Sequence, residues 1–454
     1  MVPAAATLAS SGLSPACASA KETLFARAAG ALPPRPARSR RAAFFVPGRI
    51  EVLGKHTDYA GGRSLLCAAS HGFCLVGQPR ADSRVRVISA ATGSEAEWVI
   101  GPDLQPVLGD WSNYPATVVR RLARNFPEMT AGADLAFDSD LPPASGMSSS
   151  SAFMIAVFLA LADLNGLGQS PAYREAISSR EALAAYLATI ENGRSFGALA
   201  GDRGVGTFGG SEDHTAILCC KAGTLSQYRF GPVTFERDLA VAPGLAFLVA
   251  FSGVLAEKTA AAMATYNRAS LAAARILAIW QQASGCSAPT LESAAAASAG
   301  APDDIRRAIV EAGDDEFGTG CLLERFEQFL LESRAIVPDA GDALIRGDLA
   351  RFGALVDRSQ EAAERWLGNQ IPETVTLARE ARRLGAAAAS AFGGGFGGSV
   401  WALVPRDRAG SFAREWHAAY RERFPGPASC ARFFETSAGP SAMRIEDWSQ
   451  GSAD

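Results

Sequence analysis

Residues 47–62 of this 454-residue chain read PGRIEVLGKHTDYAGG, and the apolar run Ala-Phe-Phe-Val directly precedes them. Pro-Gly opens the stretch and Gly-Gly closes it, and both are turn signals. Between these turns the chain crowds five polar side chains into ten residues: Arg49, Glu51, Lys55, His56 and Asp58. Charged side chains are costly to bury without partners. Folding alone does not explain why these charged side chains lie so close together in the sequence. The explanation has to be found in the rest of the chain.

The surrounding sequence predicts a mixture of strands and helices. Alternation of apolar residues predicts a strand that ends at Gly54, and further strands follow in the first third of the chain: residues 43–53, 63–77, 83–89 and 133–138. A Val/Val/Leu/Phe stripe at helical spacing predicts a helix over residues 110–126, after a capping Asp or Ser.

A loop of small residues enters an apolar helix at LPPASGMSSSSAFMIAVFLALADLNG, residues 141–166. The helix is expected to run from about Ser149 to Leu164 and to be buried, since it is apolar nearly all round. Free N–H groups at such a helix start form an anion site, and serine hydroxyls add donors or hold a hydrated Mg²⁺. Four consecutive serines exceed what helix capping needs.

Other glycine-rich stretches carry less information. No GxxxxGK[ST] occurs in the chain, which excludes a Walker-type phosphate loop. GVGTFG (204–209) and GGGFGG (393–398) match GxGxxG formally, but the chain has 45 glycines and such matches are weak. Neither has the acid that a Rossmann fold places at the end of the second strand.

The middle and end of the chain predict more helix than strand. Helices are expected over residues 174–191, 259–277 and 411–424, and helices dominate between 322 and 384. Strands are expected over residues 215–220, 224–230, 431–434 and just after 239. We place a domain boundary near residue 235, with a tail and linker over 1–40, a first domain over 41–235 and a second over 236–454.

Composition excludes several classes of protein. A net charge of −4 and one short basic run, RPARSRR, argue against nucleic-acid binding. Eight scattered cysteines without a CxxC pair fit a reducing cytosol, so a cytoplasmic location is expected. The first twenty residues lack a basic n-region and read as a fraying tail. The uncharged run 239–256 is broken by Pro243-Gly244, which favours a buried strand over a membrane span.

Five stretches, in this order along the chain, closely resemble the GHMP small-molecule kinases and, within them, the galactokinase family. They are PGRIEVLGKHTDYAGG, DWSNYPATVVRRL, LPPASGMSSSSAF, SGVLAEKTAAAMATYN and AFGGGFGGSVWAL. The resemblance implies the α+β GHMP kinase fold, with an N-terminal ribosomal S5-like α/β domain that carries the phosphate loop and a C-terminal ferredoxin-like α+β domain. It also implies a sugar-1-kinase that uses ATP and Mg²⁺.

The resemblance assigns roles to residues of the phosphate loop. Seven residues would wrap the ATP phosphates: Ala144, Ser145, Gly146, Met147, Ser148, Ser149 and Ser150. Ser150 would also ligate Mg²⁺. The acid that completes the metal site lies at the end of a helix in this family, as Glu191 does here, although Asp202 and Glu212 stay open as alternatives.

The resemblance also assigns the catalytic and sugar-binding residues. Asp213 would be the base that orients the sugar hydroxyl, and Arg49 would be the transition-state cation. His56, Thr57, Asp58 and Tyr266 would contact the sugar. The crowding of polar side chains in residues 47–62 is then explained by a wet substrate cleft. Besides ATP and a sugar, we expect no nucleic-acid or membrane partner, and a monomer or weak homo-oligomer.

Lys55 departs from the family pattern, which has Glu at this position in contact with the far end of the sugar. An ammonium group donates hydrogen bonds and accepts none. We therefore expect Lys55 to contact the substrate, and the alternative to galactose is an acidic or modified sugar such as a uronic acid. Two rival functions are a non-catalytic sugar sensor and a GHMP kinase acting on mevalonate or homoserine.

Overall fold

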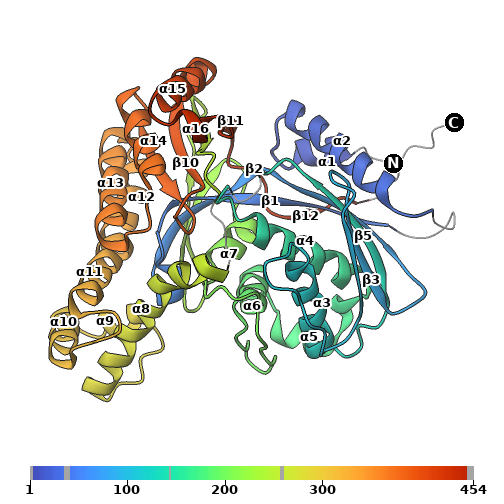
Figure 1. Cartoon of the computed structure of the whole chain (residues 1–454), viewed down its shortest axis with the longest axis horizontal. Helices are drawn as coiled ribbons and strands as arrows, with labels where there is room; N and C mark the ends of the chain where they lie inside the picture. The colour runs from blue at the N-terminus through green and yellow to red at the C-terminus, as the bar shows by residue number, and fades with distance from the viewer. Residues whose placement is uncertain (1–3, 35–40, 143–144, 256–259, 447–454) are drawn as a thin grey trace.

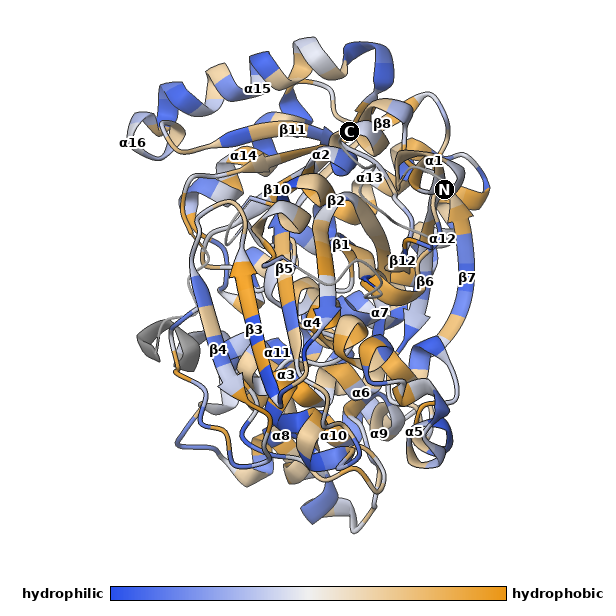
Figure 2. Ribbon diagram, turned by 90° about the vertical axis from the view of Figure 1, so that its right-hand side faces the viewer, coloured by the Kyte–Doolittle hydropathy of each residue, from blue (hydrophilic) through white to orange (hydrophobic). Residues whose placement is uncertain are grey.

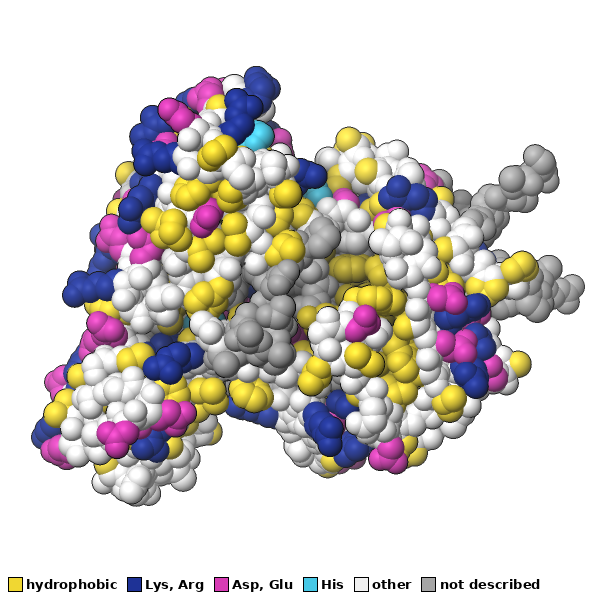
Figure 3. All heavy atoms as spheres, in the orientation of Figure 1, with side chains coloured by type: hydrophobic (Ala, Val, Ile, Leu, Met, Phe, Trp, Pro, Cys, Tyr) yellow, Lys and Arg dark blue, Asp and Glu magenta, His cyan; other side chains and the backbone are white. Residues whose placement is uncertain are grey.

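The computed structural model describes residues 4–34, 41–142, 145–255 and 260–446, with the backbone alone for residues 260–264. Figure 1 shows two halves: a blue-to-green half built around a large sheet and a yellow-to-red half beside it. Basic and acidic side chains are interspersed along the outer edge of the second half, at the left in Figure 3. None of the described helices is long and apolar enough to cross a lipid bilayer.

The large sheet contains eight strands in the described part of the chain. Its main order is β12–β1–β2–β5–β3–β4, and β6 pairs with β2 and carries β7 beside it. The strands are β1 (Ala42–Leu53), β2 (Arg63–Pro79), β3 (Arg84–Ser89), β4 (Glu95–Val99), β5 (Ala133–Ser139), β6 (Thr224–Arg229), β7 (Thr234–Ala240) and β12 (Met443–Arg444). The β3–β5 pair is parallel, and the other pairs are antiparallel.

Helices cover both faces of this sheet, which explains why β1 is buried along its whole length. The four serines lead into α4 (Ser149–Leu164), which is apolar nearly all round and packs on β1 and β2. Beside it lie α3 (Asn113–Asn125), α5 (Pro171–Ala176), α6 (Arg180–Asn192) and α7 (Glu212–Cys219). Figure 1 shows α1 and α2 on the opposite face. Successive β1 side chains therefore enter two different cores, as alternation in a strand requires.

The prediction of an unstructured N-terminal tail is wrong for residues 4–31. They form α1 (Ala4–Ser10) and α2 (Pro15–Ala31), whose Leu8 and Phe25 are fully buried against the sheet. Lys21 of α2 is also buried and donates to Asp140. The Ala/Ser-rich sequence hid this because alanines supply a packing face without a strong apolar period.

Two further expectations about local structure need correction. Residues 215–220 were expected as a strand, but they belong to α7, which is buried on most of its surface and therefore shows no helical polar face. The helix expected over 174–191 is two helices, because Ile177 leaves the helical conformation and Ser179 caps α6 by accepting from Ala182 N–H.

The second half has a four-stranded antiparallel sheet in the order β11–β8–β10–β9. The strands are β8 (Leu245–Phe251), β9 (Ala388–Phe392), β10 (Ser399–Pro405) and β11 (Arg432–Thr436). Numbered along the chain, this order is fourth–first–third–second, with helices after the first and third strands, which is the ferredoxin-like arrangement. The first sheet continues past the boundary predicted at 235, since β7 ends at Ala240, and the chain returns to it at β12.

Helices make up the rest of the second half. They are α8 (Ala260–Ser284), α9 (Leu291–Ala295), α10 (Ala301–Ala312), α11 (Thr319–Leu330), α12 (Val337–Ile345), α13 (Leu349–Ala362), α14 (Pro372–Arg383), α15 (Ala409–Arg423) and α16 (Pro425–Ala428). Hydrophilic and hydrophobic stretches alternate along α15 in Figure 2. Phe412, Trp416 and Tyr420, spaced four apart, are its buried face.

Candidate active site

A cavity opens where β1, the loop after it, the start of α7, α8 and the glycine-rich loop after β9 come together. Its lining includes the polar side chains of Arg49, Glu51, His56, Asp58, Glu191, Glu212, Asp213 and Ser270, together with Tyr59, Phe208, His214, Tyr266 and the backbone of Gly209, Gly210, Gly393 and Gly394. Segments separated by more than 300 residues thus share one site, which explains the polar crowding in residues 47–62.

Arg49 and Asp213 meet in the wall of this cavity. Arg49 Nε donates to Asp213 Oδ1 over 2.7 Å, and Arg49 Nη1 donates to the Gly146 carbonyl over 2.5 Å. Burial lowers the pKa of Arg49, but Asp213, Glu51 and Glu212 outweigh it and hold that pKa above its usual value. Arg49 is therefore a fixed cation, and Asp213, on the first turn of α7, stays more exposed than its partner.

The phosphate loop lies against Arg49 and the C-terminal glycine loop. Gly146 (φ 77°) and Ser148 (φ 55°) take left-handed conformations before α4 begins. Met147 is fully buried as an anchor, and its carbonyl accepts from Arg49 N–H. A side chain at Gly393 would meet the Gly146 carbonyl at 2.8 Å, so only glycine allows this approach. Ser145 is buried, Ser149 and Ser150 are half-buried, and Ala144 lies outside the described residues.

Glu191, at the end of α6, reaches the cavity beside the phosphate loop. Ser151 Oγ donates to its Oε2 over 2.8 Å, and Thr207 Oγ1 donates to its Oε1 over 3.3 Å. The serine in contact with Glu191 is thus Ser151, one residue beyond the predicted Ser150. Successive side chains of a helix point in directions about 100° apart, so only some of four consecutive serines can face the acid. The sequence alone does not reveal which of their hydroxyl groups does so.

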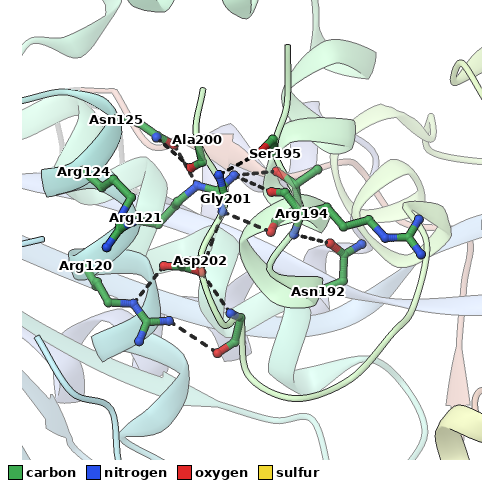
Figure 4. A network of polar contacts seen from close by, with 12 residues as sticks. Arg120, Arg121, Arg124, Asn125, Asn192, Arg194, Ser195, Ala200, Gly201 and Asp202 are labelled. Atoms are coloured by element: carbon green, nitrogen blue, oxygen red, sulfur yellow. Dashed lines mark hydrogen bonds and ion pairs between the residues drawn. The ribbon is translucent and has the colours of Figure 1, made fainter. Parts of the chain in front are cut away.

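Asp202, one of the alternatives for the metal-binding acid, lies in a separate network (Figure 4). Arg120 Nε donates to its Oδ2 over 2.8 Å, and Arg121 Nη1 lies 3.7 Å from its Oδ1. Arg121 also donates to the Arg194 carbonyl over 2.7 Å, which ties α3 to the loop after Glu191. Asp202 is therefore paired with two arginines outside the cavity, whereas Glu191 and Glu212 line the cavity.

His56 and Asp58 lie on the cavity wall, and burial changes the protonation of both. His56 (φ 57°) places Nδ1 3.0 Å from Tyr59 Oη, and burial together with Arg325 lowers the pKa of His56 to about 4. Asp58 Oδ2 accepts from Glu212 N–H over 3.0 Å, while burial raises the pKa of Asp58 to about 6. His56 is therefore neutral at pH 7.

Tyr266 and Thr57 play different parts. The Tyr266 ring lies edge-on to His56 with 6.3 Å between centroids, and a side chain at Gly394 would overlap that ring. Thr57 is fully buried, with Oγ1 2.9 Å from the Gly54 carbonyl and 2.8 Å from that of Arg63. Thr57 therefore shapes the turn and does not line the cavity, contrary to the expected sugar contact.

Lys55 also differs from the expectation. Its side chain is 1% exposed, and Nζ donates to Ser390 Oγ over 2.8 Å and to Ser359 Oγ over 3.2 Å. The ammonium group thus enters the second domain between α13 and β9 and is not part of the cavity wall. The expected contact between Lys55 and the sugar does not fit this geometry, because two serines already accept from the ammonium group.

No role was expected for Glu51, and Glu212 was expected only as an alternative metal ligand. Glu51 is two residues from Arg49 on β1, so their side chains share a face of the strand, and this spacing was a usable signal. Ladder irregularities at Pro47/Arg49 and Glu51/Leu53 bracket the pair. Bulges of this kind re-aim side chains next to active sites.

Glu212 is buried beside Asp213. Its Oε2 accepts from Ser64 Oγ over 2.6 Å. Burial, then the charges of Glu51 and Asp58, hold the pKa of Glu212 well above its usual value. The cavity wall therefore combines acids of raised pKa with one strongly held arginine.

Comparisons with known proteins agree with this arrangement. The pattern of the GHMP kinases N terminal domain matches residues 113–201, that of the GHMP kinases C terminal domain matches residues 342–422, and the galactokinase galactose-binding signature matches residues 36–79. Together these segments hold Arg49, the phosphate loop, Glu191 and the C-terminal glycine loop, whereas Asp213 lies outside them.

Individual relatives extend the match. A galactokinase from Roseiflexus sp. (strain RS-1) is 28% identical over 83% of this chain and 86% of its own length. A galactokinase from Actinobacillus pleuropneumoniae serotype 5b (strain L20) is 37% identical over 25% of this chain, and the match spans only 29% of that protein. The crystal structure of Lactococcus lactis galactokinase complexed with galactose superposes with a TM-score of 0.73 and 24% identity, over 89% of this chain and 95% of that chain. The predicted two-domain α+β fold is thereby confirmed.

Proposed function

Since the chain belongs to the GHMP kinase superfamily, and within it to the galactokinase family, we propose that it is an ATP-dependent sugar kinase that phosphorylates the anomeric hydroxyl of galactose or a related sugar. The observation that carries the proposal is the hydrogen-bonded pair of Arg49 and Asp213, held against the Gly146 carbonyl of the phosphate loop. This pair joins a charge for phosphate and an acceptor for a hydroxyl proton in one cavity.

The proposed reaction is a direct in-line transfer. The C1 oxygen of the sugar bonds to the γ-phosphorus of ATP while the bond between that phosphorus and the bridging oxygen breaks, and ADP leaves. The proton of the sugar hydroxyl passes to the Asp213 carboxylate, which the hydrogen bond from Arg49 Nε holds in place. Arg49 also offsets negative charge on the transferred phosphoryl group, and phosphoryl transfer depends mainly on such positioning and charge stabilisation.

The N–H groups at the start of α4 and the half-buried hydroxyls of Ser148, Ser149 and Ser150 would hold the phosphates of ATP. In the sugar subsite, Asp58 would accept hydroxyl hydrogen bonds, the neutral His56 would add a ring nitrogen, and Tyr266 would cover one side. Their common position on the cavity wall supports these assignments.

The residues beside the phosphate loop fit Mg²⁺. No cluster of three or more His, Cys, Asp or Glu suited to a metal occurs among the described residues. Mg²⁺ in nucleotide sites needs only one or two protein oxygens besides phosphate oxygens and water. Glu191 and Ser150 would supply them, with Ser151 and Thr207 orienting Glu191. When bound, the metal would neutralise charge on the phosphates.

An ADP-release assay with ATP and Mg²⁺ tests this proposal. The acceptor panel contains galactose, other neutral hexoses, galacturonic acid, mevalonate and homoserine. We expect a hexose 1-phosphate as the product and no turnover of mevalonate or homoserine. Sugar binding without ADP release would instead indicate a sugar sensor, and phosphorylation at another hydroxyl would refute the proposed regiochemistry.

A further inference from the structure

Glu51 is a buried carboxylate that the proposed transfer does not use. The residue is 4% exposed and lies in the cavity wall. Its Oε2 accepts from Gly393 N–H over 3.2 Å, while its Oε1 is buried without a hydrogen-bond partner among the described residues. A buried polar atom left without a partner is costly, so the folded protein has a reason to accept a ligand donor there.

The backbone around Glu51 holds this carboxylate in place. The residue sits on β1 between two ladder irregularities, on the strand face that also carries Arg49. Its donor, Gly393, has a φ of 80° and packs on the phosphate loop, where a side chain would strike the Gly146 carbonyl. Oε2 is thus bound to a rigid element.

The charges around Glu51 disfavour an anionic ligand group. Five carboxyl side chains belong to the cavity wall: Glu51, Asp58, Glu191, Glu212 and Asp213. Among the described wall residues, Arg49 is the single Lys or Arg, and it already donates to Asp213 and Gly146. The ammonium group of Lys55 favours the ionised form of Glu51, but it donates to Ser359 and Ser390 behind the wall and does not line the cavity.

We propose that Glu51 is a specificity-determining residue, which accepts a hydrogen bond from a hydroxyl or ammonium group of the acceptor sugar and excludes sugars that place a carboxylate there. The inference rests on the proposed function and deepens it, since it names neutral and amino sugars as the substrate class and rejects uronic acids. Two carboxylates brought together in a desolvated site repel each other, whereas a hydroxyl or ammonium donor to a carboxylate is favoured.

The test compares galactose, galactosamine and galacturonic acid as acceptors, at about pH 8 so that Glu51 is ionised. For the wild type we expect kcat/KM on galacturonic acid at least about 100-fold below that on galactose. Glu51→Gln should lower kcat/KM on galactose by about 10-fold. It should also lower the ratio of kcat/KM on galactose to kcat/KM on galacturonic acid by about 10-fold. The matched control is Glu95→Gln, which removes the same charge from the exposed strand β4 and should leave the ratio unchanged.

Two outcomes overturn the inference: equal use of galacturonic acid and galactose by the wild type, or an unchanged ratio in folded Glu51→Gln. The wild-type ratio decides the matter if that variant does not fold. Calorimetric binding of the three sugars separates this inference from the proposed function. Binding that prefers galactose and galactosamine without turnover would refute the kinase and keep the role of Glu51, and binding of none of them would overturn both.

Discussion

Two clusters of charge lie close to each other in this fold and differ in their balance. Around Asp202, one carboxylate faces Arg120 and Arg121, and other guanidinium N–H groups of the two arginines donate to backbone carbonyls and to the side chains of Asn125 and Thr189 (Figure 4). Around the cavity, five carboxyl groups share one arginine, and Glu51 keeps an oxygen without a partner among the described residues. The first cluster satisfies itself and fastens a loop to a helix. The second leaves hydrogen-bonding capacity for a ligand, and this difference separates a structural cluster from a functional one.

The largest expected effect comes from Asp213→Asn. The amide keeps the shape of the carboxylate but cannot take the proton of the sugar hydroxyl, so kcat should fall by about 10²–10⁴. Steady-state kinetics measure this effect, and thermal unfolding should change little. The exposed Asp407→Asn is the matched control and should keep kcat. A kcat near that of the wild type in Asp213→Asn would remove Asp213 from the proposed role.

For Asp202→Asn we expect the opposite pattern, a large loss of stability with a small loss of kcat. Removal of this buried charge leaves Arg120 and Arg121 without their acid, and breaking a buried ion pair costs about 3 kcal/mol in the free energy of unfolding. Urea denaturation measures it. At a temperature where the variant is folded, kcat should fall far less than in Asp213→Asn. An unchanged urea midpoint would show that the two clusters do not differ as described.

A pH-dependent stability is expected from Glu51. Burial, opposed by Lys55 and Arg49, raises the pKa of Glu51 from 4.5 to about 7. Between these values the folded protein keeps a proton that the unfolded chain has released, so this group lowers stability as pH rises through the window. Over the whole window the loss is at most about 3 kcal/mol.

Urea denaturation of the wild type and Glu51→Gln at about pH 5 and pH 8 measures the contribution of Glu51 together with its coupling to Glu212, because the Glu51 charge also raises the pKa of Glu212. The raised pKa of Asp58 has other causes and affects both proteins alike. We expect the variant to gain stability relative to the wild type at the higher pH. A difference between the two proteins that stays constant with pH would contradict the raised pKa of Glu51.

The smallest effect distinguishes the two neighbouring serines. Ser151→Ala removes a hydrogen bond to the buried carboxylate of Glu191 and should lower the free energy of unfolding by about 1.5–3 kcal/mol. Ser150→Ala, at the half-buried neighbour, should change it by less than about 0.5 kcal/mol and should instead raise the Mg²⁺ concentration needed for half-maximal activity. Equal effects on stability would refute the assignment of Ser151 as the partner of Glu191.

Local sequence was sufficient for the parts of the protein that short-range physics controls. The predicted bounds of α4, Ser149 to Leu164, agree with the structure, because an apolar run with a serine start and an Asn-Gly end leaves few other conformations. Strand β1 and the resemblance to a family of two-domain kinases could also be predicted, because both depend on contiguous stretches of sequence. Arg49 and Asp213 were paired by that resemblance, and the fold brings them to 2.7 Å.

Long-range packing decided the rest. Whether Lys55 faced a substrate depended on Ser359 and Ser390, which lie more than 300 residues further along the chain and accept from its ammonium group. Whether Glu51 was an idle surface acid depended on Gly393, which binds one of its oxygens and leaves the other in the cavity wall. A side chain's charge is written in the sequence, but its partners and its contact with water are set only when distant segments pack together, and these determine what the charge does.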